Sequence, residues 1–144
     1  MAVRVFTIKE ANRILPVVSQ TIVEIRAKAL AIVQLQDRIG VLVLIGGEHD
    51  RSPEHAELET RQGELQGLVA EYNAKLEELQ KIGCVLKDLN AGLVDFYGRK
   101  RNRLVFLCWK LGEKRISYWH EIEAGYSGRR PIRELQAEEE EGDA

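Results

Sequence analysis

The amino-acid sequence predicts an α+β fold, in which a long antiparallel helical hairpin is followed by a small antiparallel β-sheet of three to four strands. Apolar residues recur at three- and four-residue steps from Ile8 to Ile39 and again from Leu58 to Ile82, which is the period of an amphipathic helix. After Gly83 the period changes to two, which is typical of half-buried strands. We expect a single domain over residues 1–133, with the helical hairpin at 7–82 and a β-meander at 83–133.

Capping signals mark the ends of both predicted helices. Thr7 and Glu10 stand three residues apart before the first apolar run, a spacing in which each side chain accepts a hydrogen bond from the other's backbone amide. Ser52 and Pro53 supply an N-cap and a first helical residue for the second helix. Gly83 is expected to end that helix, because glycine readily adopts the left-handed conformation that closes a helix.

Short β-type runs after Gly83 predict the strands: CVLKDL, GLVDFY, LVFLCWKL and ISYWHEI, separated by the turn-forming NAG, GRKRN and GEK. Pairing Leu111 with Ile116 across GEK sets one face of the sheet, since alternate residues of a strand point the same way. That face, the expected core face, carries Val94, Phe96, Val105, Leu107, Trp109, Leu111, Ile116, Tyr118 and His120. Asp95, Phe106 and Glu121 then line the opposite face. A slip of one residue would exchange the two faces.

Charge is unevenly distributed, although the formal net charge is only −2. Basic residues predominate over residues 99–133, and residues 134–144 carry acids without any Lys or Arg. We expect residues 134–144 to form a disordered acidic tail, because clustered acids resist burial and repel one another. The alternative is a tail that folds back onto the basic segment.

Other features of the sequence indicate a cytoplasmic protein. The longest apolar run, VLVLI at 41–45, is too short to span a bilayer, so we expect no membrane association. Cys84 and Cys108 each lie in an apolar run, which favours reduced, buried thiols over a disulfide or a nucleophile. The sequence contains no CxxC pair, nucleophile elbow or glycine-rich phosphate loop. No cofactor is therefore indicated, apart from a divalent metal.

His120 is the first candidate for chemistry, because imidazole is the commonest metal ligand and the commonest acid or base near neutral pH. Carboxylates around Phe106 form a second candidate group that could share a cation. Together the candidate metal ligands are His120, Glu121, Asp95 and Asp88. Zinc would favour the histidine, and a hard cation would favour the carboxylates. The plainer interpretation is a hydrogen-bonded core histidine, with the acids paired to Lys87, Lys110 or Arg129.

A basic patch forms another candidate site. Its members are Arg99, Lys100, Arg101, Arg103 and Arg129. With Tyr97 and Tyr126 beside them, these cations suit a phosphate backbone with stacked bases. The acidic net charge of the chain favours the plainer interpretation, in which a hairpin loop carries solvated charge.

Apolar sequence in the hairpin predicts self-association. The run VLVLI ends the first helix, where a two-helix hairpin has little core beneath it. A sheet with apolar residues on both faces also needs more cover than one hairpin provides. We therefore expect a homo-oligomer, most simply a twofold dimer, with a separate protein partner as the alternative.

Three segments in order carry a family resemblance: FTIKEANRILP, GCVLKDLNAGLVDF and LCWKLGEKRISYWHEIEAGYSGRRPI. They resemble domain of unknown function 2203, an uncharacterised bacterial protein family, from Phe6 to Ile132. The residues that match the family's pattern are Glu10, Asn12, Pro16, Lys87, Asp88, Asp95, Cys108, Trp109, His120, Glu121, Gly125, Gly128 and Arg129. The resemblance implies a small bacterial cytosolic protein and assigns no catalytic residue.

Taken together, the sequence favours a non-catalytic interaction or scaffold protein that self-associates. The alternative is a metal-binding protein or metal-dependent enzyme with a site around His120 and nearby carboxylates. The third interpretation is nucleic-acid binding through the basic loop at 99–103. Oligomeric mass, bound metal and salt-dependent binding of nucleic acid distinguish the three.

Overall fold

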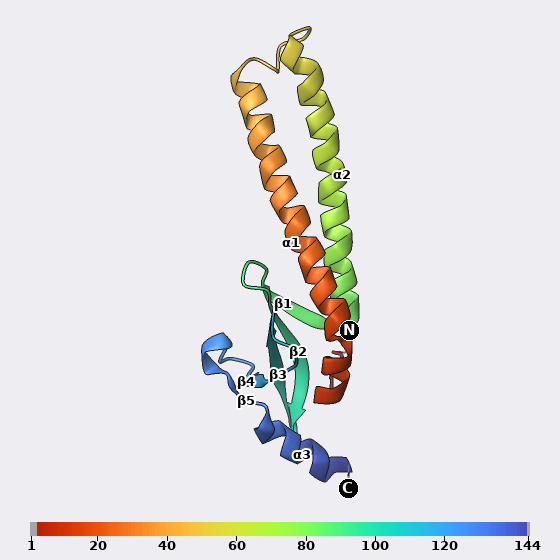
Figure 1. Ribbon diagram of the computed structural model, residues 1–144, viewed down its shortest axis with the longest axis vertical. Coiled ribbons are helices and arrows are strands. Elements are labelled where there is room, and N and C mark those ends of the chain that lie inside the picture. The colour runs from red at the N-terminus through yellow and green to blue at the C-terminus, as the bar shows by residue number, and fades with distance from the viewer. Residues whose placement is uncertain (1–2, 144) are drawn as a thin grey trace. The chain divides into compact units, whose positions relative to one another are not determined.

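The computed structural model describes residues 3–143, with side chains described as far as residue 139, and confirms the α+β class (Figure 1). Helices α1 (Ile8–Leu44) and α2 (Pro53–Ile82) form the predicted helical pair. Ion pairs fix their antiparallel alignment, with Lys28 bound to Glu71 at 2.9 Å and Arg38 to Glu57 at 2.7 Å. None of the helices in the described part of the chain combines the length and the hydropathy needed to cross a lipid bilayer.

The predicted caps are present at the helix ends. The Glu10 backbone amide donates to Thr7 Oγ1 at 3.1 Å, and the Thr7 amide donates to Glu10 Oε1 at 3.0 Å. These hydrogen bonds with Thr7 lower the pKa of Glu10. Ser52 Oγ accepts the amide of His55 at 3.1 Å, and Gly83 follows α2 with a φ of 103°. The sequence therefore determines where both helices start and where α2 ends.

The chain divides into two compact units. Residues 23–77 form one unit, which is the distal part of the helical pair. Residues 1–22 and 78–144 form the other, in which the start of α1 and the end of α2 accompany the sheet. All the candidate metal ligands lie in this second unit.

The sheet has five antiparallel strands rather than three to four, in the order β1-β2-β3-β4-β5. Their bounds are β1 Cys84–Asp88, β2 Leu93–Lys100, β3 Arg103–Lys110, β4 Tyr118–Glu121 and β5 Arg130–Pro131. The added strand β5 is only two residues long and follows a short 3-10 helix, η1 (Tyr126–Gly128). A piece so short gives no periodic signal in the sequence.

One face of the sheet forms the core of this unit. Its buried residues are Val94, Phe96, Val105, Leu107, Trp109 and Trp119. The Phe6 ring, just before α1, meets Phe96 edge to face with ring centroids 5.1 Å apart. Beyond β3, the Ile116 amide donates to Asn12 Oδ1 of α1 at 2.6 Å.

The expected register of β4 is wrong by one residue, and the error exchanges its faces. His120 pairs with Phe106, and Cys108 pairs with Tyr118. Leu111 does not pair with Ile116, because its amide donates to Gly92 O at 2.8 Å and the chain then makes a wider loop. His120 and Tyr118 therefore lie on the face of Asp95 and Phe106, while Glu121 moves to the opposite face.

The tail expected to be disordered from residue 134 instead forms helix α3 (Arg133–Asp143). Its Leu135 is buried, and Glu138 binds Lys100 of β2 at 2.8 Å. Glu139 Oε1 accepts the Ile8 amide at 3.1 Å. Cations and a backbone donor of the same unit thus offset the repulsion among the acids. This arrangement corresponds to the alternative expectation, in which the tail folds back onto the basic segment.

We predict that Asn12→Ala lowers the free energy of unfolding by about 1–3 kcal/mol, because the buried Ile116 amide loses its acceptor. Asn12→Asp keeps an acceptor oxygen at the same place and should cost clearly less. Urea unfolding followed by circular dichroism measures both values. Equal losses in the two variants would contradict the assigned hydrogen bond.

Candidate metal centre

Three buried side chains meet on the sheet face opposite Phe96. Asp95 comes from β2, Cys108 from β3 and His120 from β4, and each is at most 1% exposed. One ligand atom from each residue lies within 4.8 Å of the other two. The strand register explains this cluster. Asp95 pairs with Cys108, and Phe106, two residues before Cys108 on the same face of β3, pairs with His120.

The His120 ring lies between two acceptors. Nδ1 is 2.7 Å from the Glu121 carbonyl oxygen, and Nε2 is 3.0 Å from Asp95 Oδ2. A carbonyl oxygen cannot donate, so Nδ1 carries a proton. In a neutral imidazole Nε2 then has a bare lone pair facing a carboxylate oxygen. A cation must therefore lie between Nε2 and Oδ2, either a proton or a metal ion.

The second oxygen of Asp95 has no hydrogen-bond partner among the described residues. Oδ1 is buried, and the Cys108 thiol, a weak donor in the same cluster, interacts with the Asp95 carboxylate in a way that helps to raise the pKa of Cys108. A buried carboxylate oxygen without a strong donor is unfavourable, because it has lost its hydration. Asp95 thus presents one oxygen to His120 and leaves the other without a strong hydrogen-bond donor.

Cys108 is a protonated thiol when no metal is bound. Burial is the largest influence, and it raises the pKa of Cys108 from 9.0 to about 11 despite the opposing hydrogen bond from Arg129. Arg129 Nε donates to Cys108 Sγ at 3.3 Å, an arrangement that would stabilise negative charge on the sulfur. The expectation of a buried, unreactive thiol is confirmed for its burial.

Arg129 covers the cluster from the segment between β4 and β5. Its guanidinium donates to both carboxylate oxygens of Glu113, at 2.7 and 3.1 Å. Tyr118 and Tyr126 lie against it, with ring centroids 4.2 and 4.6 Å from Cζ. Burial alone would lower the pKa of Arg129, but the hydrogen bonds to Glu113 and Cys108 raise it overall. Arg129 is therefore a fixed cation that is already neutralised.

Two glycines shape the covering segment. Gly125 has a φ of 67°, which L side chains rarely adopt. A Cβ at Gly128 would lie 2.5 Å from the Ala124 Cβ, so the chain can close tightly only without a side chain there. The tight turn leads directly to Arg129, which follows Gly128.

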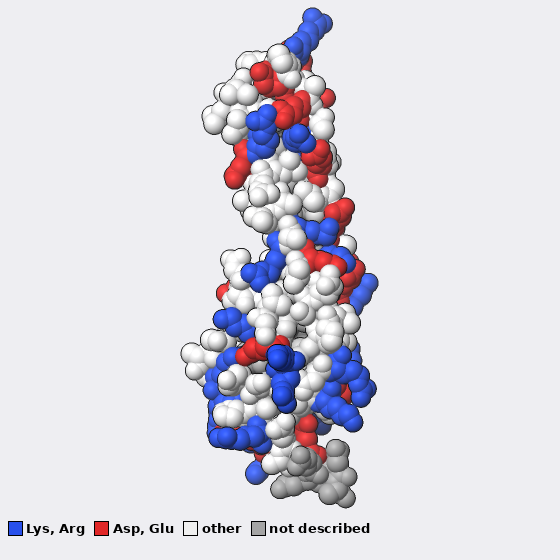
Figure 2. Space-filling model, viewed as in Figure 1, with Lys and Arg blue, Asp and Glu red and all other residues white. Residues whose placement is uncertain are grey.

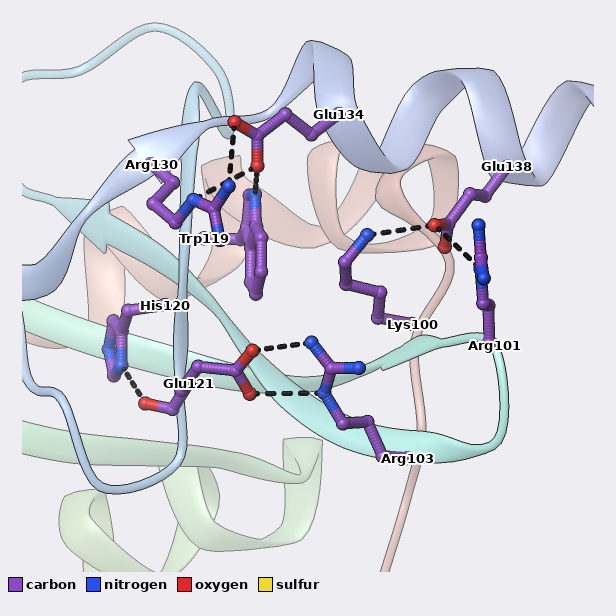
Figure 3. Close-up of polar contacts among 9 residues, drawn as sticks. All are labelled: Lys100, Arg101, Arg103, Trp119, His120, Glu121, Arg130, Glu134 and Glu138. Carbon is purple, nitrogen blue, oxygen red and sulfur yellow. Dashed lines mark hydrogen bonds and ion pairs between the residues drawn. The ribbon is translucent and has the colours of Figure 1, made fainter.

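Two predicted ligands lie outside the cluster. Asp88 Oδ1 accepts the Ala91 amide at 3.0 Å in the β1–β2 turn. Glu121 points to the other face and pairs with Arg103, whose hydrogen bonds lower the pKa of Glu121 (Figure 3). Only the backbone carbonyl of Glu121 reaches His120. The structure therefore unites Asp95 and His120, adds Cys108, and separates Asp88 and Glu121 from them.

The basic patch is largely ion-paired. Lys and Arg side chains gather over the sheet-bearing unit with acids among them (Figure 2). Arg103 binds Glu121, while Lys100 and Arg101 bind Glu138 of α3 at 2.8 and 3.5 Å. Arg129 belongs to the cover of the metal cluster instead. Arg99 lines a cavity beside Val5 and Thr7.

The candidate ligand absent from the sequence-based set is Cys108. Strand alternation carried a usable signal, because Asp95 and Cys108 fall on the same face once β2 and β3 pair across the GRKRN turn. The apolar neighbours of Cys108 favoured a packing role instead. Glu113 had no signal of its own, because its contact with Arg129 depends on the loop after β3.

Comparison with known proteins identifies the family. Residues 4–132 match the model of a family described as "Uncharacterized conserved protein (DUF2203)". The chain belongs to this family. The match covers the helical pair, all five strands and the Asp95, Cys108 and His120 cluster. No curated protein matches the chain, and no solved structure does.

We predict that Cys108 resists thiol reagents in the folded protein. A rise of the pKa from 9.0 to about 11 reduces the thiolate fraction at pH 8 about 100-fold, and the rate should then increase about tenfold per pH unit up to the pKa. The Cys84→Ser variant, freed of metal with a chelator, isolates Cys108 for labelling with dithionitrobenzoate. Arg129→Ala should accelerate labelling by uncovering the sulfur, and native labelling as fast as in urea would contradict the assignment.

Proposed function

We propose that this protein binds a divalent transition metal, with zinc as the best match, through Asp95, Cys108 and His120. The observation that supports this most strongly is the 3.0 Å contact between His120 Nε2 and Asp95 Oδ2, with Nδ1 already bonded to a carbonyl oxygen. Such a pair needs a cation between its atoms. The sulfur of Cys108 lies close to both atoms, so a third ligand atom is present, which favours a metal ion over a proton as that cation.

The donor set suits zinc. Imidazole nitrogen, thiolate sulfur and carboxylate oxygen are its usual protein ligands. Tetrahedral coordination at ordinary zinc bond lengths separates such ligand atoms by about 3.3–3.6 Å. The three ligand atoms already lie within 4.8 Å of one another, so small side-chain movements would complete the geometry. The buried Oδ1 of Asp95 supplies a further oxygen without a competing strong donor.

The surrounding hydrogen bonds are those expected around metal ligands. A metal-bound histidine commonly donates its other N–H to a backbone carbonyl, as His120 Nδ1 does to Glu121. Arg129 Nε would donate to a metal-bound thiolate as it now does to the thiol. Metal binding displaces the thiol proton, so the apparent affinity should increase with pH.

The closed surroundings favour a structural metal over a catalytic one. The side chains of Asp95 and His120 are each 2% exposed, and Arg129 covers Cys108. A catalytic metal keeps a position open to substrate, whereas a structural metal is enclosed. A metal here would join β2, β3 and β4, and it would stabilise the sheet in proportion to its affinity.

We predict near-stoichiometric zinc in untagged protein purified without chelator, measured by mass spectrometry of metals. Removal of the metal should lower the melting temperature, and zinc should restore it. Cobalt substitution should produce a thiolate-to-metal absorption band. A folded protein that binds neither zinc nor cobalt would show that a proton alone joins Asp95 to His120.

Matched variants identify the ligands. Cys108→Ser should remove the cobalt–thiolate band and weaken zinc binding at least 10-fold, whereas Cys84→Ser, at the other buried cysteine, should leave both unchanged. Glu121→Gln is the second control, since its side chain faces away from the cluster. Loss of the band in Cys84→Ser rather than Cys108→Ser would refute the site.

A second candidate function is self-association through the helical pair, which would make the protein an interaction or scaffold module. The supporting observation is the exposed apolar surface of α1, where Leu30 and Leu44 are 59% and 86% exposed. Nucleic-acid binding has less support, because acids already pair with most of the predicted basic patch.

A further inference from the structure

Helix α1 carries a second apolar stripe on the side away from α2. Within the distal unit, Leu42 is buried, and Lys28 and Arg38 pair with acids of α2, which defines the side that faces α2. The exposed apolar residues on the opposite side are Val23, Leu30, Val33, Val41 and Leu44, at 46–86% exposure. At 100° per residue these five fall within about 80° around the helix axis.

This surface, which we call the α1 stripe, has the spacing of a coiled-coil interface. Four of its residues fall on positions that alternate by three and four through 23, 26, 30, 33, 37, 40 and 44, and Val41 lies beside position 40. Such a heptad pattern keeps one face against a partner helix over several turns. Arg26 and Asp37 interrupt the apolar positions, and both are exposed. Neither has an ion-pair partner among the described residues.

The two charges determine which arrangement of a second copy is favourable. In a parallel pair in register, Arg26 would face Arg26 and Asp37 would face Asp37, so like charges would oppose each other. Consider an antiparallel pair whose twofold axis passes between residues 31 and 32. The numbers of two facing residues then add up to 63. Arg26 then meets Asp37 on both sides of the twofold axis.

The same register pairs the apolar positions. Leu30 meets Val33 twice at the centre, which places the bulkiest contact on the axis. Val23 meets Gly40, where no side chain occupies the space, and Val41 lies beside it. Over positions 23–40, one register therefore pairs the opposite charges and also pairs the apolar residues, as a self-complementary twofold interface requires.

We propose that the α1 stripe is the interface of an antiparallel homodimer, in which Arg26 of each chain pairs with Asp37 of the other. This inference deepens the proposed self-association by naming its surface and register, and it rests on that function. It is independent of the metal centre. The positions that face one another in this register are residues 23–40 of α1, about 27 Å of helix at 1.5 Å per residue.

Charge reversal with rescue tests the register on the full chain. Arg26→Asp and Asp37→Arg each place like charges opposite one another, so each should raise the dimer dissociation constant at least 10-fold. The double variant restores both pairs and should recover the wild-type value within about threefold. Equimolar mixing of the two single variants should form a heterodimer, because one variant then has acids at both positions 26 and 37 and the other has arginines at both. Sedimentation equilibrium against the chain mass of 16.4 kDa measures all four.

Glu77→Arg is the control, since it makes the same charge change at an exposed position of α2. Circular dichroism verifies that the variants remain folded. A wild-type monomer at 100 μM would overturn both self-association and this interface. A dimer whose dissociation constant is unchanged by either single reversal would overturn the α1 register while leaving self-association in place.

Discussion

The contact between Asp95 and His120 is the constraint on which the sheet face opposite Phe96 depends. Two buried polar side chains from β2 and β4 meet at 3.0 Å, and the strand between them supplies Cys108. Unpaired, each would carry the desolvation cost of a buried polar group. Together with a shared proton they form a neutral unit, which allows a carboxylate and an imidazole to lie where an apolar side chain would otherwise be expected.

The cover over this cluster follows from the same requirement. Arg129 brings a guanidinium to the sulfur of Cys108, and Glu113 neutralises it. Tyr118 and Tyr126 enclose the cation between aromatic faces. Planar donors and stacked rings make this site specific for arginine, since lysine offers neither the fork nor the plane. Paired charges thus cover the cluster on the polar face, whereas on the apolar face Phe6 contacts Phe96 and Glu134 of α3 accepts a hydrogen bond from Trp119.

The two compact units offer different chemistry. The sheet-bearing unit contains the buried polar cluster and an acidic helix paired with cations. The distal helical unit has few buried apolar side chains, among them Leu42 and Leu58, and a second apolar stripe on its free side. A two-helix pair has no third layer to cover such a stripe. The metal centre proposed for one unit and the interface proposed for the other therefore depend on different parts of the chain.

The sequence by itself determined the helices, their caps and the change to strands at Gly83, because these depend on neighbours within four residues. It also placed Asp95 and His120 among the candidate ligands. Only the tertiary structure decided the β4 register, because the loop after Lys110 is held by contacts with Gly92, Asn12 and Arg129 from distant parts of the chain. A shift of one residue exchanged the strand faces, brought His120 to Asp95 and Cys108, and removed Glu121. Long-range pairing likewise ordered α3, whose acids find cations that lie far away in the sequence.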